Sequence, residues 1–504
     1  MKEKNFYITT PIYYPSANFH IGHCYTTIIS DSIARFKRMK GYDVFFQTGT
    51  DEHGQKIQKK AEEAGVSPKE YVDEIVLNSQ DLWKRLNISY DNFVRTTDEQ
   101  HINCVQKIFN KLYDQGDIYK GEYKGLYCTP CESFWTSTQL NDGKCPDCGR
   151  DVIEVKEEAY FFKLSKYQDR LVDYYDKHPE FIEPISRKNE MLNNFIKPGL
   201  EDLCVSRTSF DWGIPVSFDE KHVVYVWIDA LSNYLSGLGY LTNDDSLFKK
   251  YWPAGLHIVG KEIIRFHTII WPIMLMALGL DLPEKIFGHG WLIVNGGKIS
   301  KSLGNYKDPR EYIDEYGVDA VRYFALREVP FGSDGNFSEE ALVNRINGDL
   351  ANILGNLVQR TLAMTKKYFN GKVQNLKNYS EIDSEFISCI NNLDELVSNK
   401  MDKLEVNCAI DEIFNVLRAS NKYIDDTTPW ILAKDENSYD RLQTILYNLL
   451  ESIRVCANLL SPFLPDTSIE IKRQLNICDE SLSYNESNTY DVLTPKVIFN
   501  RIIN

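Results

Sequence analysis

The sequence has no apolar run long enough to cross a lipid bilayer. Its longest nearly uninterrupted apolar stretch, residues 268–280, contains a proline and falls well short of the roughly 20 residues that a membrane-spanning helix needs. An apolar signal core is also missing, since residues 1–6 run directly into strand-like sequence. We therefore expect a cytoplasmic protein with no membrane segment.

Positive charge is scarce as well. There are 57 Lys and Arg residues against 72 Asp and Glu, which gives a formal net charge of −15. Proteins that bind nucleic acids in general are usually basic, so this excess of acid argues against broad RNA or DNA binding. It does not exclude a local basic track.

Internal repeats and low-complexity tracts are absent, and the composition is that of an ordinary soluble globular protein. A chain of 504 residues is longer than a single hydrophobic core normally accommodates, so we expect three or four structural units. Strand-like residues at 6–10 and 44–50, and again at 223–227 and 257–260, predict the two halves of an interrupted parallel sheet. From about residue 347, amphipathic patterns predict a separate α-helical domain.

The first motif is His20-Ile-Gly-His23, which follows a strand and opens a helix near Gly22. Two imidazoles at a helix N-terminus can bind phosphate oxygens, and Gly22 would let a nucleotide base approach the backbone. The alternative is that both histidines only cap and pack the helix. Four residues alone leave both interpretations open.

The second motif is the glycine-bracketed loop 296–304, which carries Lys298, Ser300, Lys301 and Ser302. Its lysines could meet the charge that builds on the β- and γ-phosphates of ATP when the α-phosphate is attacked. A solvated basic turn is the alternative.

Four of the 11 cysteines form two CxxC pairs, Cys128, Cys131, Cys145 and Cys148. In a reducing compartment this spacing predicts four thiolates around Zn²⁺, with Gly143 and Gly149 easing the turns. A site with four protein ligands has no open position for water, so the metal would be structural. Chance spacing of free cysteines is the alternative.

Two sets of side chains recur at helical spacing. The first is Trp227, Ala230, Leu231 and Tyr234, and the second is Ile263, His267 and Trp271. Two faces rich in rings could form a cup for a flexible thioether, because sulfur packs well against ring edges. Ordinary core packing is the alternative.

In the helical region, Asn356 and Arg360 lie four residues apart, and Trp430 follows Thr428 and Pro429, a pair that predicts a helix start. An exposed tryptophan could stack on an unpaired base. Surface and core positions without a ligand are the alternative.

The histidine motif and the lysine loop, in that order, resemble the two signatures of class I aminoacyl-tRNA synthetases, which flank ATP. The strings PIYY (11–14), VWIDA (226–230), GKEI (260–263), FH (266–267) and HGW (289–291) resemble the methionyl-tRNA synthetase family in particular. The resemblance runs from residue 7 to about residue 465. It implies methionine activation by ATP with Mg²⁺, followed by transfer to tRNA(Met), including the initiator.

The resemblance also implies roles for individual residues. Asp51 of the string TDEHG would accept a hydrogen bond from the α-ammonium group of methionine. The alternative is that Asp51 has only a capping role. The residues implied for catalysis are His20, His23, Lys298 and the critical Lys301. Those implied for ATP binding are His20, Gly22, His23, Lys298, Ser300, Lys301 and Ser302. Those implied for methionine binding are Ile12, Tyr14, Asp51, Arg207, Trp227, Ala230, Tyr234, Ile263, His267 and Trp271, and those implied for the CAU anticodon are Asn356, Arg360 and Trp430. Leu231 stands where many relatives carry proline.

The implied fold is α/β. A Rossmann-type parallel-sheet catalytic domain (1–115 and 204–297) would be interrupted by a zinc-knuckle insertion (116–203). The next region (298–346) would contain the lysine loop and a stem-contact segment. An α-helical anticodon-binding domain (347–504) would follow it. No C-terminal dimerisation module is visible, so we expect a monomer with one Zn²⁺ per chain.

Two other functions compete with this interpretation. Synthetases for isoleucine, valine or leucine resemble the chain around both signatures, but they carry a large editing insertion, for which this chain has no room. A catalytically inert tRNA-binding protein could share the fold, but it would not need intact His20, His23, Lys298 and Lys301.

Overall fold

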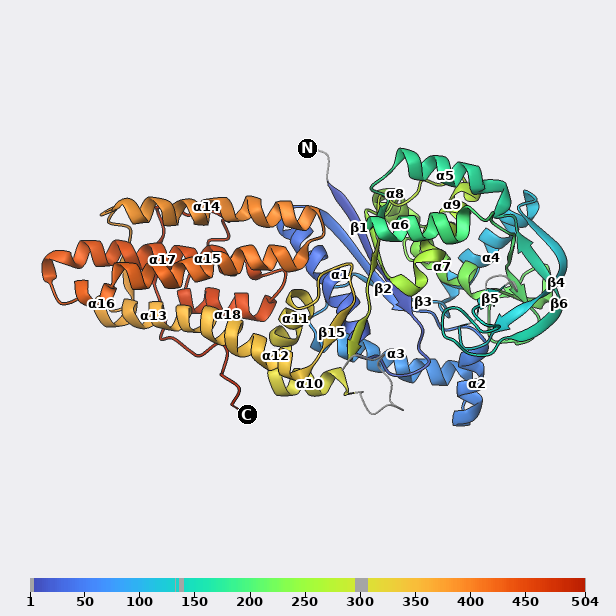
Figure 1. Cartoon of the computed structure of the whole chain (residues 1–504), viewed down its shortest axis with the longest axis horizontal. Coiled ribbons are helices and arrows are strands. Elements are labelled where there is room, and N and C mark those ends of the chain that lie inside the picture. The colour runs from blue at the N-terminus through green and yellow to red at the C-terminus, as the bar shows by residue number, and fades with distance from the viewer. Residues whose placement is uncertain (1–3, 132, 136–139, 295–306, 504) are drawn as a thin grey trace. The chain divides into compact units, whose positions relative to one another are not determined.

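The computed structural model describes residues 4–131, 133–135, 140–294 and 307–503. The chain divides into two compact units, which are described separately (Figure 1). Unit 1 comprises Met1–Lys84 and Ile88–Trp291, and unit 2 comprises Arg85–Asn87 and Leu292–Asn504.

A six-stranded sheet forms the centre of unit 1, with the order β3-β2-β1-β12-β13-β7. Every neighbouring pair is parallel, and the central strands are almost entirely buried, as expected where helices cover a parallel sheet. The predicted α/β class is therefore confirmed. The strands are β1 (Asn5–Tyr13), β2 (Asp43–Thr50), β3 (Asn92–Arg95), β7 (Ile182–Glu183), β12 (Leu256–Gly260) and β13 (Ile286–His289).

Helices connect these strands and supply most of the core of unit 1. They are α1 (Ile21–Met39), α2 (Gln55–Ala64), α3 (Pro68–Arg85), α4 (Glu99–Asp114), α5 (Gln168–Lys177), α6 (Ile185–Met191), α7 (Val226–Ser236), α8 (Ser246–Tyr251) and α9 (Trp271–Leu278), with the shorter turns η2 (Ser165–Tyr167), η3 (Leu192–Ile196), η4 (Lys261–Ile263) and η5 (Phe266–Ile270). Residues 268–278 of the apolar stretch are thus helical and mostly buried, and residues 279 and 280 follow the end of α9.

The predicted strand at 223–227 is wrong in its extent and in its sheet. Residues up to Val224 belong to β11 (Asp219–Val224), which pairs antiparallel with β9 (Ser206–Arg207) and β10 (Pro215–Val216) outside the parallel sheet, and α7 begins at Val226. A run of β-branched residues favours a strand but does not specify its partner. The prediction at 257–260 is confirmed by β12.

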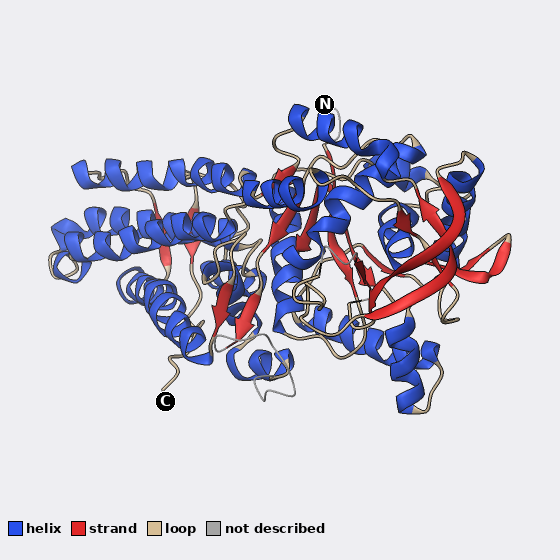
Figure 2. Ribbon diagram, turned by 45° about the vertical axis from the view of Figure 1, so that its right-hand side comes forward, coloured by secondary structure: helices blue, strands red, loops and turns tan. Residues whose placement is uncertain are grey.

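The cysteine region lies on a second antiparallel sheet with the order β5-β4-β6-β8. Figure 2 shows its two long strands as a curved pair. The strands are β4 (Ile118–Cys128), β5 (Ser133–Trp135), β6 (Ile153–Phe162) and β8 (Leu203–Cys204).

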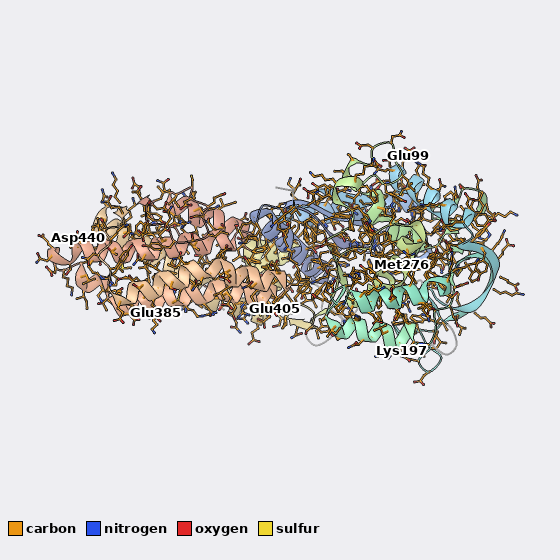
Figure 3. The ribbon with its side chains drawn as sticks, turned by 90° about the horizontal axis from the view of Figure 1, so that it is seen from above. Glu99, Lys197, Met276, Glu385, Glu405 and Asp440 are labelled. Atoms are coloured by element: carbon orange, nitrogen blue, oxygen red, sulfur yellow. The ribbon has the colours of Figure 1, made fainter. Side chains whose placement is uncertain are left out.

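Unit 2 is mainly helical, as predicted. Figure 3 labels Glu385 and Asp440 on two of its long helices, and the patterns at 409–424 and 439–460 lie within α15 and α17. The helices are α10 (Pro309–Tyr316), α11 (Val318–Arg327), α12 (Glu339–Arg345), η7 (Ile346–Gly355), α13 (Asn356–Phe369), α14 (Glu381–Asp402), α15 (Val406–Thr427), α16 (Pro429–Leu432), η8 (Glu436–Ser438), α17 (Tyr439–Leu460) and α18 (Pro465–Leu475). Two small sheets pair β14 (Leu292–Val294) with β15 (Gly335–Phe337) and β16 (Lys372–Gln374) with β17 (Thr489–Asp491).

Across the part of the chain that the structure describes, no helix combines the length and the apolar character that a bilayer-spanning segment requires.

Candidate active site

The strand order of unit 1 points to a ligand site. From β1 the chain proceeds to β2 and β3 on one side, and the sheet continues on the other side with β12. The order therefore reverses between β1 and β12, and parallel sheets bind ligands at the carboxyl ends of the strands at such a point. Tyr14, Asp51 and Ile263 follow the carboxyl ends of β1, β2 and β12.

The histidine motif forms the N-terminus of α1. Nδ1 of His20 accepts a hydrogen bond from the backbone N–H of Gly22 (3.1 Å), and Nδ1 of His23 accepts one from the N–H of His20 (3.0 Å). The two ring centroids are 4.0 Å apart. The capping role that the sequence allowed is therefore real, and Nδ1 of each ring performs it.

These bonds determine where the imidazole protons lie. Burial, with His20 close by, lowers the pKa of His23 well below its ordinary value, so the His23 ring is neutral near pH 7. A neutral ring whose Nδ1 accepts a hydrogen bond carries its proton on Nε2. Nε2–H is a donor suited to an anion, and it lies at a helix end that already favours negative charge.

Asp51 lies at the junction of β1 and β2. Its side chain is buried, and its backbone N–H donates to the carbonyl of Tyr13 (2.9 Å). Half-buried Ile12 pairs with Gly49 across these two strands. A Cβ on Gly49 would lie 2.0 Å from the carbonyl oxygen of Val94, so the close approach of β2 and β3 requires glycine there.

Tyr14 is half-buried. The Lys56 ammonium lies 5.4 Å from the centroid of its ring. This predicted methionine contact therefore faces a cation on α2.

Three of the predicted ring residues meet around Tyr234. Its hydroxyl donates to Nε2 of His267 (2.8 Å), and Nδ1–H of His267 donates to the carbonyl of Ile263 (3.0 Å). The ring of Trp271 lies 5.6 Å from that of Tyr234 between centroids. Burial lowers the pKa of His267 to about 4, so this cluster is uncharged near neutral pH.

Trp227 belongs to a neighbouring stack. It lies parallel to Phe266 with the centroids 3.6 Å apart. Its indole N–H is buried and has no hydrogen-bond partner among the described residues. Ala230, one turn further along α7, is buried.

The regular helical face that the sequence predicted for Ile263, His267 and Trp271 is wrong in geometry. Ile263 ends the 3₁₀ turn η4, His267 lies in the π-helical turn η5, and Trp271 begins α9. A π turn widens the spacing along the helix, and here it falls among the buried rings. His267 and Trp271 nevertheless both contact Tyr234.

Arg207 is buried in β9. Its guanidinium lies 4.2 Å from the ring centroid of Tyr127 and donates to Oγ of Ser209 (2.8 Å). The described contacts of Arg207 thus include a residue of the strand that ends at Cys128.

The four cysteines of the CxxC pairs come together. Their sulfur atoms all lie within 4.8 Å of one another, and the Cys128–Cys148 and Cys145–Cys131 pairs are 3.5 and 3.9 Å apart. A tetrahedron of Zn–S bonds of about 2.3 Å has edges of about 3.8 Å. Gly143 and Gly149 adopt the positive φ angles, 76° and 69°, that the turns were expected to need. This group could hold a metal ion.

Lys298, Ser300, Lys301 and Ser302 lie outside the described residues. Their predicted roles stay predictions.

Two family models match the chain. The model described as tRNA synthetases class I (M) matches residues 6–154 and 150–362, and the model described as the anticodon binding domain of methionyl tRNA ligase matches residues 373–502. The chain belongs to the methionyl-tRNA ligase family. The resemblance inferred from the motifs is thereby confirmed.

Individual family members agree with this assignment. The methionine–tRNA ligase of Clostridium acetobutylicum is 63% identical over 476 residues, 94% of this chain and 74% of the relative. That of Caldanaerobacter subterraneus is 64% identical over 478 residues, 95% of this chain and 75% of the relative. A structure of Mycobacterium tuberculosis methionyl-tRNA synthetase with methionyl-adenylate superposes with a TM-score of 0.93 at 42% identity, covering 98% of this chain and 99% of that one.

The anticodon residues predicted from the family lie in unit 2. Asn356 and Arg360 are exposed on α13, and the Trp430 side chain on α16 is 40% exposed. Thr428 precedes Pro429 at the start of α16 as predicted, but no hydrogen bond from its side chain caps the helix, and its backbone is left-handed (φ 43°).

Three buried polar residues that lie next to predicted site residues were not singled out from the sequence. His257 of β12 accepts from the indole N–H of Trp271 (3.3 Å) and contacts Thr9 (2.7 Å). Glu52 and His53 are both buried beside Asp51. The polar run TDEHG at the end of an apolar strand was the available signal for Glu52 and His53, because buried charges require partners.

Proposed function

We propose that the chain is a methionine–tRNA ligase that activates L-methionine with ATP and transfers it to the terminal adenosine of tRNA(Met). In the first step the methionine carboxylate attacks the α-phosphorus, the bond to the bridging oxygen breaks, and pyrophosphate leaves. Mg²⁺ bound to the phosphates would supply positive charge to this leaving group. In the second step a hydroxyl of the terminal adenosine attacks the methionyl carbonyl, and AMP leaves. Positioning and charge stabilisation would supply the catalysis.

One observation carries this proposal: the uncharged ring cluster of Tyr234, His267 and Trp271 packs beside β12, at the strand-order reversal of the sheet. A neutral, ring-lined surface favours a polarizable thioether over a charged side chain. Ile12, Tyr14, Trp227, Ala230 and Ile263 would complete the methionine site.

The nucleotide would lie at the N-terminus of α1. The Nε2–H groups of His20 and His23 would donate to phosphate oxygens, and Gly22 would face the base. From the family resemblance, Lys298, Ser300, Lys301 and Ser302 would bind the phosphates, with Lys298 and Lys301 meeting the charge of the transition state.

Asp51 would bind the α-ammonium group of methionine through a charge-assisted hydrogen bond. Arg207 would lie close to methionine and the adenylate. Its contact with the Tyr127 ring supports a link between this arginine and the cysteine region.

The four clustered thiolates would hold one Zn²⁺ per chain. The sulfur separations fit a tetrahedral ion, and four protein ligands leave no position for water. Cys128, Cys131, Cys145 and Cys148 would thus stabilise the insertion without taking part in the reaction.

In unit 2, Trp430 would stack on a base of the CAU anticodon while Asn356 and Arg360 contact base edges. Initiator tRNA would be a substrate as well. We propose that the functional regions of the chain end at residues 115, 203, 297 and 346, as the sequence predicts. We also propose that the protein is a cytoplasmic monomer.

The decisive experiment is amino-acid-dependent exchange of pyrophosphate into ATP. Methionine should support exchange at least about tenfold better than isoleucine or leucine, since a hydrophobic pocket discriminates even a single methylene by about 1–3 kcal/mol and these side chains differ by more than that. Equal or faster exchange with isoleucine or leucine would overturn the assignment. Lys301→Ala should reduce adenylate formation severely and leave methionine binding mostly intact.

A further inference from the structure

Helix α7 has a buried polar face opposite its ring-bearing face. Asp229, Asn233 and Ser236 recur at i, i+4 and i+7, and each is at most 1% exposed. Trp227 and Tyr234, the predicted methionine contacts, lie on the other side of the helix. Buried polar side chains on one helix face are costly unless they are paired, so their partners reveal what this face does.

The partners of Asp229 are two buried imidazoles. Its Oδ2 accepts from Nδ1 of His53 (2.7 Å), and its Oδ1 accepts from Nε2 of His101 (2.7 Å). Nδ1 of His101 in turn lies 2.7 Å from Oγ of Ser236. His101 belongs to α4, whose first residue, Glu99, is labelled in Figure 3.

Charge explains why the carboxylate tolerates burial. Full burial by itself would raise the pKa of Asp229, but His53 and His101 more than offset that effect and the pKa lies below its ordinary value. Asp229 is therefore ionised, and it is one end of two charge-assisted hydrogen bonds.

His53 belongs to the loop 51–54 that carries Asp51. The carboxylate of Glu52, the residue between them, accepts hydrogen bonds from Nε–H (2.7 Å) and Nη2–H (2.9 Å) of Arg95. The backbone carbonyl of Glu52 accepts from the indole N–H of Trp212 (2.6 Å). Arg95 and Trp212 thus hold the loop at Glu52, and Asp229 holds it at His53.

We propose that Asp229 is a positioning residue for the amino-acid substrate. Through His53 it keeps the loop 51–54 in the conformation in which Asp51 meets the α-ammonium group, and it joins that loop to the helix that carries Trp227 and Tyr234. This proposal rests on the proposed function, and it assigns to the acidic residue of the VWIDA string a task distinct from that of its ring-bearing neighbours.

Asp229→Asn tests the role without removing volume. The amide keeps one acceptor for His53 but loses the negative charge, so the loop is held less firmly. We expect the KM for methionine in the exchange assay to rise about tenfold, while the KM for ATP changes less than about twofold, because only the amino-acid contact is displaced. Asp229→Ala should raise the KM for methionine further.

Asp31→Asn is the matched control. Asp31 is also a fully buried carboxylate of unit 1, and it accepts from the backbone N–H (2.7 Å) and Oγ (2.6 Å) of Ser89. Asp31→Asn should lower the thermal unfolding temperature but leave the KM for methionine unchanged. A merely structural role for Asp229 predicts the same result for both variants, and that result would overturn the proposal.

His53 provides a rescue test. His53→Asn places an amide N–H near the position of Nδ1, so it should retain most of the methionine affinity, whereas His53→Ala should raise the KM as Asp229→Ala does. In the double variant Asp229→Ala/His53→Ala the two effects on the KM for methionine should be clearly less than additive, because both substitutions remove the same interaction. Additive effects would contradict the coupling. A wild-type chain without methionine-dependent exchange would instead refute the proposed function itself.

Discussion

The Tyr234 hydroxyl donates a 2.8 Å hydrogen bond to Nε2 of His267. Because Nδ1–H of the same imidazole donates to the carbonyl of Ile263, both ring nitrogens are engaged and the ring has one orientation and one tautomer. The pair joins α7 to the segment after β12, and it connects two sets of residues that the sequence assigned to one methionine site.

Removal of the Tyr234 hydroxyl should show that the orientation of His267 depends on this hydrogen bond. Tyr234→Phe leaves Nε2 of His267 as a buried acceptor without its donor, which should lower the free energy of unfolding by about 1–3 kcal/mol. The KM for methionine should rise as the imidazole reorients. Denaturant unfolding and exchange kinetics measure the two effects.

Tyr167→Phe is the control for that change, since Tyr167 is a buried tyrosine of unit 1 whose hydroxyl donates to Asp117 (2.9 Å). It should lose stability without any change in the KM for methionine. Equal KM values in Tyr234→Phe and wild type would show that the hydroxyl does not shape the amino-acid site.

The buried His267 should make stability depend on pH. Its pKa of about 4 in the folded chain lies below the ordinary value of about 6.5, so the unfolded state binds a proton first as the pH falls. Stability should therefore fall between about pH 6.5 and pH 4, by about 1.4 kcal/mol per pH unit for this group, and the effect should level off below about pH 4.

Urea unfolding of wild type and His267→Gln across this range measures that contribution. The variant should show a shallower loss of stability, because glutamine does not titrate. His178→Gln, which removes a histidine with a 45% exposed side chain, should keep the wild-type slope. Identical slopes for wild type and His267→Gln would refute the assignment.

Metal content tests the cysteine cluster. Purified chain should contain about one equivalent of zinc by elemental analysis, and Cys145→Ser should lose it, since a structural zinc site needs all four ligands. The variant should also unfold at a lower temperature. Cys389→Ser, at an exposed cysteine outside the cluster, should retain the metal, and retention in both variants would rule out the site.

Trp430 should affect tRNA charging but not amino-acid activation. Trp430→Ala removes a stacking surface that contributes about 1–3 kcal/mol per base, so the KM for tRNA(Met) should rise at least about fivefold while methionine-dependent exchange is unchanged. Ile431→Ala, at a neighbour that is 55% exposed, is the control. Normal charging by Trp430→Ala would exclude an anticodon contact.

The features best predicted from sequence are local. The CxxC pairs, the helix start near Gly22 and the long amphipathic helices each depend on residues within one or two turns of chain, or on one short hairpin, so spacing alone indicates them. The strand at 223–227 was predicted less well, because β propensity does not select a sheet partner. The π turn at His267 was missed because helical spacing assumes a regular helix.

The sequence by itself determined the family, the α/β class with its helical domain, and the identities of the candidate ligands. Only the tertiary structure decided the pairing of Asp229 with His53 and His101, which lie 176 and 128 residues away. The physical reason is that a buried carboxylate needs partners, but its own sequence neighbourhood does not state which strand or helix will supply them. The fold makes that choice when it packs α7 against the loop after β2 and against α4.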